Sequence, residues 1–386
     1  MKIGIDCRLW DETGVGRYIR NLVKQLQILD KKNSYVIFAL SKDYDQFKIQ
    51  NSKFKIVKVD IRWHTIEEQL RFPQILNREN MDLMHFPYIS VPIFYNKPYV
   101  ATIHDLILHH FPTGQASTLP LPLYKLKILG YKFVIKHTAQ KAEKIIAISK
   151  ATKDEIIEHL KVDPKKIIVT YEGAFDKSKV KSQKSKVQVK SKKYFLYVGN
   201  AYPHKNLERL IEAFKSFCHP EFISGSQMSR DYELRQNDTR LVLVGKEDYF
   251  YRRIKAKVKD MGLEKNVKFL GEVSDDELIS LYKNARALVI PSLMEGFGLP
   301  ALEAMENKCL VLASNIASLI EICGESAVYF NPYNIKDMVS KMESIYSNDT
   351  YQQSANIKKG IERTKRFSWQ KMAEETLKVY ESCAGV

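Results

Sequence analysis

Two carboxylates frame a glycine-rich turn in the second half of the chain. Glu295 and Glu303 stand eight residues apart in EGFGLPALE, which follows the apolar run ALVIPS after two further residues. The glycines let a ligand approach the backbone, and the start of a following helix attracts an anion such as phosphate. Carboxylates accept hydrogen bonds from sugar hydroxyls, so the pattern indicates a nucleotide sugar. A structural alternative stays open, in which Glu303 complements the helix dipole and Glu295 is a solvated loop residue.

Further candidates stand where an apolar run gives way to a turn or a helix. TGVGRY, residues 13–18, is a second glycine turn, although G-x-G alone is a weak signal. Lys205 lies between a strand-like run and a helical pattern, where its ammonium group can neutralise a diphosphate. His104 ends the apolar run YVATIH. Taken alone, Lys205 is equally well a solvated lysine, and His104 a hydrogen-bonded loop histidine.

No metal site or disulfide framework is expected. Asp-Tyr-Asp at 43–45 has the form of a metal-binding motif, but it follows a strand-like run in what reads as a polar loop. The five cysteines are odd in number and form no C-x-x-C pair, so we expect packed thiols. They are Cys7, Cys218, Cys309, Cys323 and Cys383.

Short apolar runs alternate with helical patterns through most of the chain. This alternation is typical of βαβ units and parallel sheets. It begins with KIGIDC at residues 2–7 and restarts with KYFLYVGN at 193–200, so we expect two doubly wound, Rossmann-like α/β domains. The predicted parts are an N-terminal domain at 1–175, a lysine-rich linker at 176–193, a C-terminal domain at 194–365 and a C-terminal helix at 366–386.

Residues 219–239 interrupt this pattern. They separate a predicted helix from the strand-like run RLVLVG, where about 2–6 residues usually suffice. We expect a surface insertion, with a short extra helix around DYELRQ as the alternative. Replacing residues 221–237 by a short turn should then preserve stability, because loop-closure entropy changes slowly with length.

The net charge of +16 is compatible with nucleic acid, an anionic membrane face or a phosphorylated substrate as partner, and charge alone does not choose between them. Many lysines lie in the linker without interleaved aromatics, and no nucleic-acid recognition motif is present, which disfavours a nucleic-acid partner. Residues 119–138, LPLPLYKLKILGYKFVIKHT, form a basic amphipathic pattern. We expect its apolar face to pack on the core, with docking on an anionic membrane surface as the alternative. Without a secretory signal or a membrane-spanning run, we expect a cytoplasmic protein.

Together these motifs resemble the retaining glycosyltransferases of family 4, and most closely their mannosyltransferase-like branch. The resemblance implies the GT-B fold, with two Rossmann-like domains facing across a cleft, the first for the acceptor and the second for a nucleotide sugar. It also implies that the C-terminal helix returns to the N-terminal domain. The matching stretches are IGIDCRLWDETGVGRY, TIHDL, KIIAISKATKDEI, YEG, YVGNAYPHKNLERLIEAF, the run from VKFLGE to LVLASN, and FSWQKMAEETLKVY.

The resemblance assigns roles around the two glutamates. Glu303 would accept hydrogen bonds from the nucleotide ribose, and Glu295 would face the hydroxyls of the donor sugar. Lys205 and the backbone amides of Gly298 and Leu299 would bind the diphosphate. We expect Glu303 and Lys205 to be exposed rather than part of a core.

Other roles concern the remaining candidates. Gly16 would close over the diphosphate from the first domain, His104 would lie near the transferred sugar, and the backbone of Val273 would contact the nucleobase. Family members often carry an arginine at one of two positions before the lysine, but here these are Asn200 and His204. The diphosphate site therefore has one fewer permanent cation than usual, which bears on donor affinity and activity.

The resemblance implies transfer of a hexose, with mannose favoured, from a nucleoside-diphosphate sugar such as GDP-mannose to a glycan or lipid-linked acceptor. No metal or other cofactor is expected, since lysine and helix amides can meet the charge of the leaving diphosphate. A nucleotide-sugar epimerase of the same fold is an alternative, and it would need no acceptor. A glycoside hydrolase with the two glutamates as paired carboxylates leaves TGVGRY and HKN without a role. A basic nucleic-acid-binding protein is the third alternative.

Overall fold

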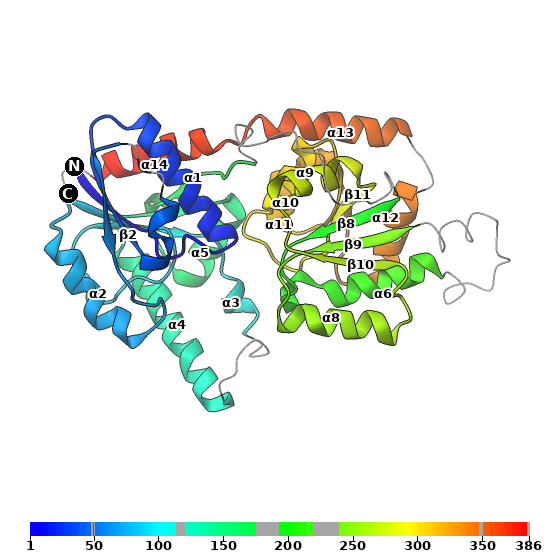
Figure 1. Cartoon of the computed structure of the whole chain (residues 1–386), viewed down its shortest axis with the longest axis horizontal. Helices are drawn as coiled ribbons and strands as arrows, with labels where there is room; N and C mark the ends of the chain where they lie inside the picture. The colour runs from blue at the N-terminus through cyan, green and yellow to red at the C-terminus, as the bar shows by residue number, and fades with distance from the viewer. Residues whose placement is uncertain are drawn as a thin grey trace. The chain divides into compact units, whose positions relative to one another are not determined.

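The computed structural model describes residues 1–47, 49, 51–112, 120–174, 193–219, 239–346 and 350–383 (Figure 1). The chain forms two compact units, Met1–Gly173 with Phe367–Val386, and Ala174–Arg366. Apart from residues 193, 219 and 239, the predicted linker and insertion lie outside the described residues. None of the helices in the described part combines the length and apolar character that crossing a bilayer requires.

The first unit is built on a parallel sheet of seven strands in the order β3-β2-β1-β4-β5-β6-β7. Ile5 of β1 lies opposite Ile37 of β2 on one side and His85 of β4 on the other. The strands are β1 (Lys2–Asp6), β2 (Ser34–Ala39), β3 (Phe54–Lys58), β4 (Leu83–Phe86), β5 (Tyr99–Ile103), β6 (Lys144–Ala147) and β7 (Ile167–Val169). The helices are α1 (Gly14–Leu29), α2 (Ile66–Arg78), α3 (Ile107–His110), α4 (Leu121–Lys141), α5 (Lys150–Leu160) and α14 (Trp369–Ser382), with 3-10 turns η1 (Ser41–Gln46) and η2 (Pro164–Lys166).

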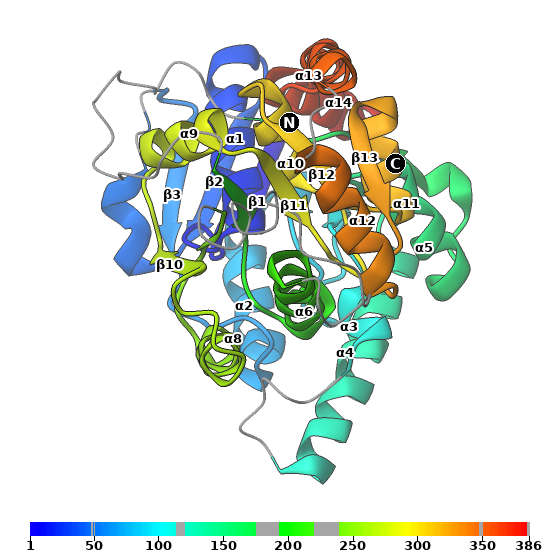
Figure 2. The same cartoon turned by 90° about the vertical axis from the view of Figure 1, so that its right-hand side faces the viewer.

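The second unit repeats this plan with six parallel strands in the order β10-β9-β8-β11-β12-β13 (Figure 2). The strands are β8 (Tyr194–Val198), β9 (Arg240–Val244), β10 (Val267–Gly271), β11 (Ala287–Ile290), β12 (Leu310–Ser314) and β13 (Ala327–Phe330). The helices are α6 (Leu207–Cys218), α8 (Tyr249–Asp260), α9 (Asp275–Asn284), α10 (Leu299–Glu306), α11 (Ala317–Cys323), α12 (Ile335–Tyr346) and α13 (Thr350–Thr364), with 3-10 turns η4 (Pro203–Lys205) and η6 (Gly324–Ser326).

Burial explains why these segments form strands and helices. Every residue of β11, β12 and β5 is buried, as expected for parallel strands covered on both faces. On α6, Leu207, Leu210, Ile211 and Phe214 are buried at helical spacing, so one face of this helix packs in the core of the second unit.

In both sheets the direction of winding reverses at the first strand. β1 lies between β2 and β4, and β8 lies between β9 and β11. Ligands of such sheets bind beyond the carboxyl ends of the strands at this reversal. The segments that follow β8 and β11 contain Lys205 and Glu295, so the second unit brings these candidates to the expected edge.

The C-terminal helix α14 belongs to the first unit, where it packs against α1. The hydroxyl of Tyr380 on α14 lies 2.6 Å from Nδ1 of His85 on β4, and both residues are buried. This confirms the expectation that the C-terminal helix returns to the N-terminal domain.

The α4 helix does not pack on the core along its whole length, contrary to the prediction from the sequence. Its inner face includes the buried Ile135, but four large apolar side chains lie exposed at helical spacing, with exposed fractions between 53% and 65%. The predicted core packing is therefore wrong for this stripe, which consists of Leu123, Leu126, Leu129 and Phe133. The N-terminal half of α4 projects from the rest of the first unit, so no other helix or strand among the described residues covers it (Figures 1 and 2).

Two other local expectations can be compared with the structure. All five cysteines are free and buried, as predicted. The predicted polar loop at 43–45 is instead part of the 3-10 turn η1, with Asp43 fully buried and Lys42 Nζ 3.7 Å from its Oδ1. The loop prediction failed because the turn packs this carboxylate inward.

Candidate active site

An ion pair occupies the reversal point of the second sheet. Lys205 ends η4 after β8, and Glu295 lies in the loop after β11. Lys205 Nζ donates hydrogen bonds to both carboxylate oxygens of Glu295, at 2.7 and 2.8 Å. The side chains are only 17% and 13% exposed, so neither charge is freely solvated. The two groups that the sequence singled out separately therefore form one unit.

The surroundings of Glu295 keep it ionised. Burial acts to raise the pKa of its carboxyl, but Lys205 and a hydrogen bond from Ser292 Oγ, at 2.6 Å, outweigh burial and lower the pKa below its usual range. A glycoside hydrolase needs one protonated carboxyl group as its acid. Glu295 is unsuited to that role, so a hydrolase would have to use another group as its acid.

Asn206 holds the lysine-bearing turn in place. Its backbone adopts the left-handed conformation, with φ of 60°. Its side-chain amide donates to the carbonyl oxygens of Pro291 and Pro332, at 3.0 and 2.9 Å. The segment after β8 is thereby tied to the segments after β11 and β13. Neither Asn206 nor Ser292 was given a role from the sequence, although Asn206 belongs to the quoted HKN motif.

His204 does not supply the cation that an arginine would. Its side chain is buried, and burial followed by the charge of Lys205 lowers the pKa of its imidazole to about 4. The ring is therefore neutral at pH 7. Asn200, at the other arginine position, accepts a hydrogen bond from the amide of Tyr202 through its side-chain oxygen, at 3.3 Å. Neither of these two positions therefore supplies a second cation beside Lys205.

The glycine turn leads directly into α10. Gly298 has φ of 99°, and a Cβ at this position would lie 2.6 Å from Leu319 Cδ2, so the turn requires glycine. Pro300 lies in the first turn of α10, where the absence of an N–H costs nothing. The first amides of a helix have no intrahelical acceptor, so those of Gly298 and Leu299 are available to an anion. Val273, half-buried, follows β10 at the same edge of the sheet.

Glu303 is buried, so the prediction that its side chain is exposed is wrong. Its residue is only 2% exposed, and its Oε2 accepts a hydrogen bond from the hydroxyl of Tyr282 on α9, at 2.9 Å. The physical reason is that α10 is short and enclosed. All five residues from Ala301 to Met305 are buried, so no face of the helix is left to solvent there.

In the first unit, His104 directly follows β5 and lines a pocket. Its Nε2 lies 3.0 Å from the carbonyl oxygen of Pro87, and its Nδ1 lies 3.5 Å from Oε1 of the buried Glu172. The ring of Tyr18, from the TGVGRY motif, meets the imidazole edge-on at 5.0 Å. Neither Glu172 nor Tyr18 was identified from the sequence, although both lie in quoted motifs.

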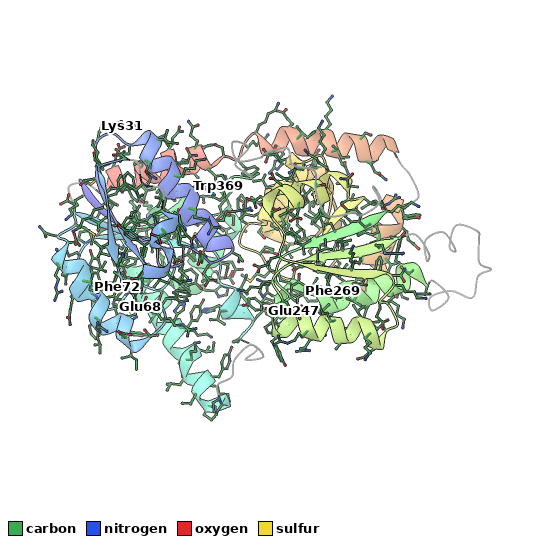
Figure 3. The ribbon with its side chains drawn as sticks, viewed as in Figure 1. Lys31, Glu68, Phe72, Glu247, Phe269 and Trp369 are labelled. Atoms are coloured by element: carbon green, nitrogen blue, oxygen red, sulfur yellow. The ribbon has the colours of Figure 1, made fainter. Side chains whose placement is uncertain are left out.

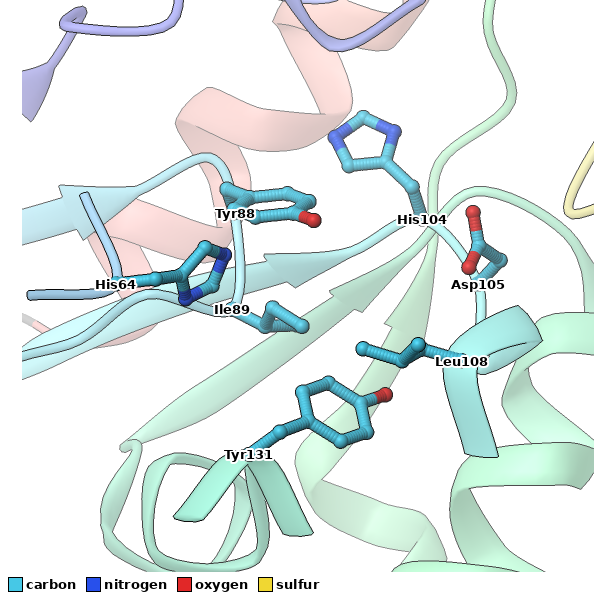
Figure 4. Close-up of a pocket in the computed structure, with 7 residues that line it drawn as sticks. All are labelled: His64, Tyr88, Ile89, His104, Asp105, Leu108 and Tyr131. Atoms are coloured by element: carbon cyan, nitrogen blue, oxygen red, sulfur yellow. The ribbon is translucent and has the colours of Figure 1, made fainter. Parts of the chain in front are cut away.

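The pocket opens to solvent, and its space, with the open solvent included, measures about 340 Å³. Aromatic rings of Tyr88 and Tyr131 and the carboxylate of Asp105 contribute to its wall (Figure 4). Such a mixture of ring faces and polar groups is suited to a sugar-like ligand. The residues that line the pocket are His64, Tyr88, Ile89, His104, Asp105, Leu108 and Tyr131.

Close packing at the start of α1 requires glycine at position 16. A Cβ at Gly16 would lie 2.4 Å from the carbonyl oxygen of Trp10, so only glycine allows α1 to begin so close to the loop after β1. Arg8 anchors that loop from within. Its buried guanidinium group donates to Asp6 at 2.7 Å and to Glu68 at 2.6 Å, and it lies over the ring of Phe72 (Glu68 and Phe72 are labelled in Figure 3).

Two family models match the chain. The model for glycosyltransferase family 4 covers residues 13–174, and the model for glycosyl transferases group 1 covers residues 178–363. The chain belongs to the family 4 glycosyltransferases. The recognition made from the motifs is therefore confirmed.

Relatives within the family include enzymes of O-antigen assembly. The O-antigen chain mannosyltransferase RfbU of Salmonella typhimurium is 29% identical over 283 residues, which are 73% of this chain and 70% of RfbU. The O-antigen chain mannosyltransferase B of Escherichia coli is 24% identical over 96% of each chain. Nothing in these comparisons supports the epimerase alternative.

Solved structures confirm the fold. Sucrose-phosphate synthase from Thermosynechococcus elongatus superposes with a TM-score of 0.76 at 19% identity, over 99% of this chain and 98% of the other. The lipopolysaccharide glycosyltransferase WaaG superposes with a TM-score of 0.72 at 15% identity, over all of both chains. The two parallel sheets of this family 4 glycosyltransferase therefore form a GT-B fold.

Proposed function

We propose that the protein transfers a hexosyl group, mannose above others, from a nucleoside-diphosphate sugar to a glycan or lipid-linked acceptor with retention of configuration. The observation that carries the proposal is the Lys205–Glu295 pair beside the glycine-led start of α10, at the sheet edge where nucleotides bind. Two relatives named as O-antigen chain mannosyltransferases support mannose as the transferred sugar and a growing glycan as acceptor. GDP-mannose is the donor that the resemblance to the mannosyltransferase-like branch favours.

The chemistry assigned to this site is electrostatic. As the bond between sugar and diphosphate loosens, negative charge develops on the leaving group, and Lys205 with the amides that begin α10 stabilises it without a metal. Glu295 then exchanges its contact with Lys205 for the hydroxyls of the donor sugar. Retention follows if the acceptor attacks from the face of the leaving phosphate, with a phosphate oxygen as base. Asn206 acts as a positioning residue, because it clamps the turn that carries Lys205.

The pocket beside His104 is the proposed place for the acceptor. Tyr88 and Tyr131 offer ring faces for a sugar, and Asp105 offers a carboxylate for its hydroxyls. This assignment follows the division of labour implied by the family, in which the first domain binds the acceptor.

A lipid-linked acceptor is consistent with the surface of α4. The exposed apolar stripe of Leu123, Leu126, Leu129 and Phe133 is flanked by exposed lysines. Apolar side chains that insert between lipid headgroups, together with lysines that attract anionic lipids, favour peripheral binding to a membrane. The lysines are Lys125, Lys127, Lys132 and Lys136.

A binding panel followed by a transfer assay tests the proposal. GDP and GDP-mannose should raise the melting temperature more than the uridine and adenosine counterparts, because a ligand of the native state stabilises it. Mannosyl transfer from GDP-mannose should require an added acceptor, and it should be lost in Lys205→Ala but kept in the exposed control Lys283→Ala. Sugar conversion without an acceptor would instead indicate an epimerase, and no response to any nucleotide would refute the donor site.

A further inference from the structure

Four potential metal ligands gather on α3 and α5 of the first unit. His109 and His110 end α3, and Glu155 and His159 lie one turn apart on α5. Within the described residues, the ligand atoms of His110, Glu155 and His159 all lie within 4.8 Å of one another. His110 Nε2 lies 2.6 Å from Glu155 Oε2, and His159 Nε2 lies 3.4 Å from the same oxygen.

This spacing is close to that of a tetrahedral zinc site. Zinc lies about 2.0–2.2 Å from histidine nitrogen or carboxylate oxygen, which puts its ligand atoms roughly 3.3–3.5 Å apart. The distance between His159 and Glu155 already fits, and His110 needs only a small side-chain rotation. The ring planes of His110 and His159 lie at 84° with centroids 4.8 Å apart, so the two imidazoles approach Glu155 from different directions.

His109 is suited to join the site. Its ring centroid lies 5.4 Å from that of His159. Its Nδ1 is buried and has no hydrogen-bond partner among the described residues.

We propose that His110, Glu155 and His159 bind a divalent transition-metal ion of the zinc class, with His109 as a fourth ligand. Imidazole ligands favour such ions over magnesium and calcium, which prefer sites made of oxygen alone. All three principal side chains are partly exposed, so the ion can enter from solvent.

The ion would act as a clip between two helices. The α3 helix spans only the four residues Ile107–His110, and a single helical turn is not stable by itself. It carries Leu108 on the wall of the pocket and begins two residues after Asp105, which lines the same pocket together with His104. Binding at His110 and His159 would therefore fix one wall of the pocket against α5. This role is separate from sugar transfer, for which no metal is proposed.

Cobalt provides a direct probe. The full-length chain is freed of metal with a chelator and titrated with Co²⁺, whose visible absorption reports its ligands, and Zn²⁺ is then added as competitor. We expect one Co²⁺ per chain, displaced by Zn²⁺. The double variant His110→Ala/His159→Ala should bind at least about tenfold more weakly, since even changes behind the ligands cost this much. His137→Ala, a histidine of α4 outside the cluster, should bind as the unaltered chain does.

Thermal unfolding distinguishes the loss of metal ligands in the double variant from misfolding of that variant. Without metal, the double variant and the unaltered chain should melt at similar temperatures. Zn²⁺ should raise the melting temperature of the unaltered chain and of His137→Ala, but not that of the double variant. Absence of Co²⁺ binding, or equal binding by the double variant, would overturn the proposal. Metal binding without a rise in melting temperature would overturn the clip between α3 and α5.

Discussion

Lys205 and Glu295 form an ion pair, and this pairing determines how substitutions at either residue should act. In the proposed function, a diphosphate bound at Lys205 would compete with the carboxylate of Glu295 for the ammonium group. Because both side chains are largely buried, their attraction is stronger than that of a surface pair. A change at either residue therefore alters the charge that the other presents to a ligand.

Glu295→Gln should separate turnover from nucleotide binding. The amide is a weaker acceptor for sugar hydroxyls, so turnover should fall by about 10²-fold, as for loss of one transition-state contact. Affinity for free GDP should stay constant or rise, because Lys205 loses a competing anion. Steady-state kinetics and GDP titration measure the two effects, with the exposed Glu264→Gln as control. A matching loss of GDP affinity would contradict the assigned role.

Glu303→Gln should act differently from Glu303→Ala. Glutamine keeps an acceptor for the hydroxyl of Tyr282, whereas alanine leaves that buried hydroxyl without this partner, at a cost of about 1–3 kcal/mol in the free energy of unfolding. Both variants should bind nucleotide more weakly, since both lose the carboxylate proposed for the ribose. Urea unfolding and GDP titration distinguish the two effects. Unaltered GDP affinity in both would remove Glu303 from the donor site.

At the scale of elements, buried polar groups join α14 to the sheet of the first unit. The hydroxyl of Tyr380 meets His85 Nδ1, and Thr102 Oγ1 lies 2.8 Å from His85 Nε2 and 3.2 Å from the hydroxyl of Tyr18. Burial, and then the proximity of His104, lowers the pKa of His85 from 6.5 to about 3. The ring is therefore neutral in the folded protein.

This buried histidine should make stability depend on pH. In the unfolded chain His85 binds a proton below its ordinary pKa of 6.5, whereas in the folded chain it does so only near pH 3. The contribution of neutral His85 to the free energy of unfolding is therefore complete above pH 6.5 and is lost as the pH falls toward 3. Between pH 7.5 and 5 the loss should be about 2 kcal/mol. His85→Gln should be less stable at pH 7.5 but lose correspondingly less on acidification, as measured by urea unfolding; an equal loss would refute the linkage.

The exposed stripe of α4 should bind anionic membranes. Leu126→Glu/Phe133→Glu removes apolar area and adds negative charge, so co-sedimentation with anionic vesicles should be lost. The unaltered chain should bind anionic but not neutral vesicles, and salt should weaken binding. Leu70→Glu, at an exposed position of α2, should bind as the unaltered chain does. No binding by the unaltered chain at low salt would dismiss the membrane proposal.

At the scale of the whole molecule, the chain crosses between its two units near residues 173 and 367. The first unit is therefore incomplete without the end of the chain, because α14 packs on α1. A chain that ends at Arg366 should lose the stability of its first unit, while its second unit keeps GDP binding. In calorimetry, the unfolding transition of the second unit, which GDP shifts to higher temperature, should be the same in the shortened and the unaltered chain. The transition of the first unit should move to lower temperature or disappear. A complete loss of GDP binding would show that the second unit depends on α14.

The sequence by itself determined the features that depend on neighbouring residues. Alternating apolar runs and helical patterns predicted two α/β units with parallel sheets, because side-chain periodicity reports which faces are buried. The glycine and proline of EGFGLP predicted the turn at Gly298 and the start of α10 through local backbone preferences. Motifs along the chain indicated the family, which the comparisons confirm.

Only the tertiary structure decided which side chains meet. Lys205 and Glu295 are 90 residues apart, and His85 and Tyr380 are 295 apart. Glu303 is enclosed because α9 supplies Tyr282. An apolar stripe on α4 could be recognised from its spacing, but whether a neighbouring element covers it depends on the packing of distant segments. Pairing and burial are properties of the assembled chain, because they depend on contacts that no local pattern of residues encodes.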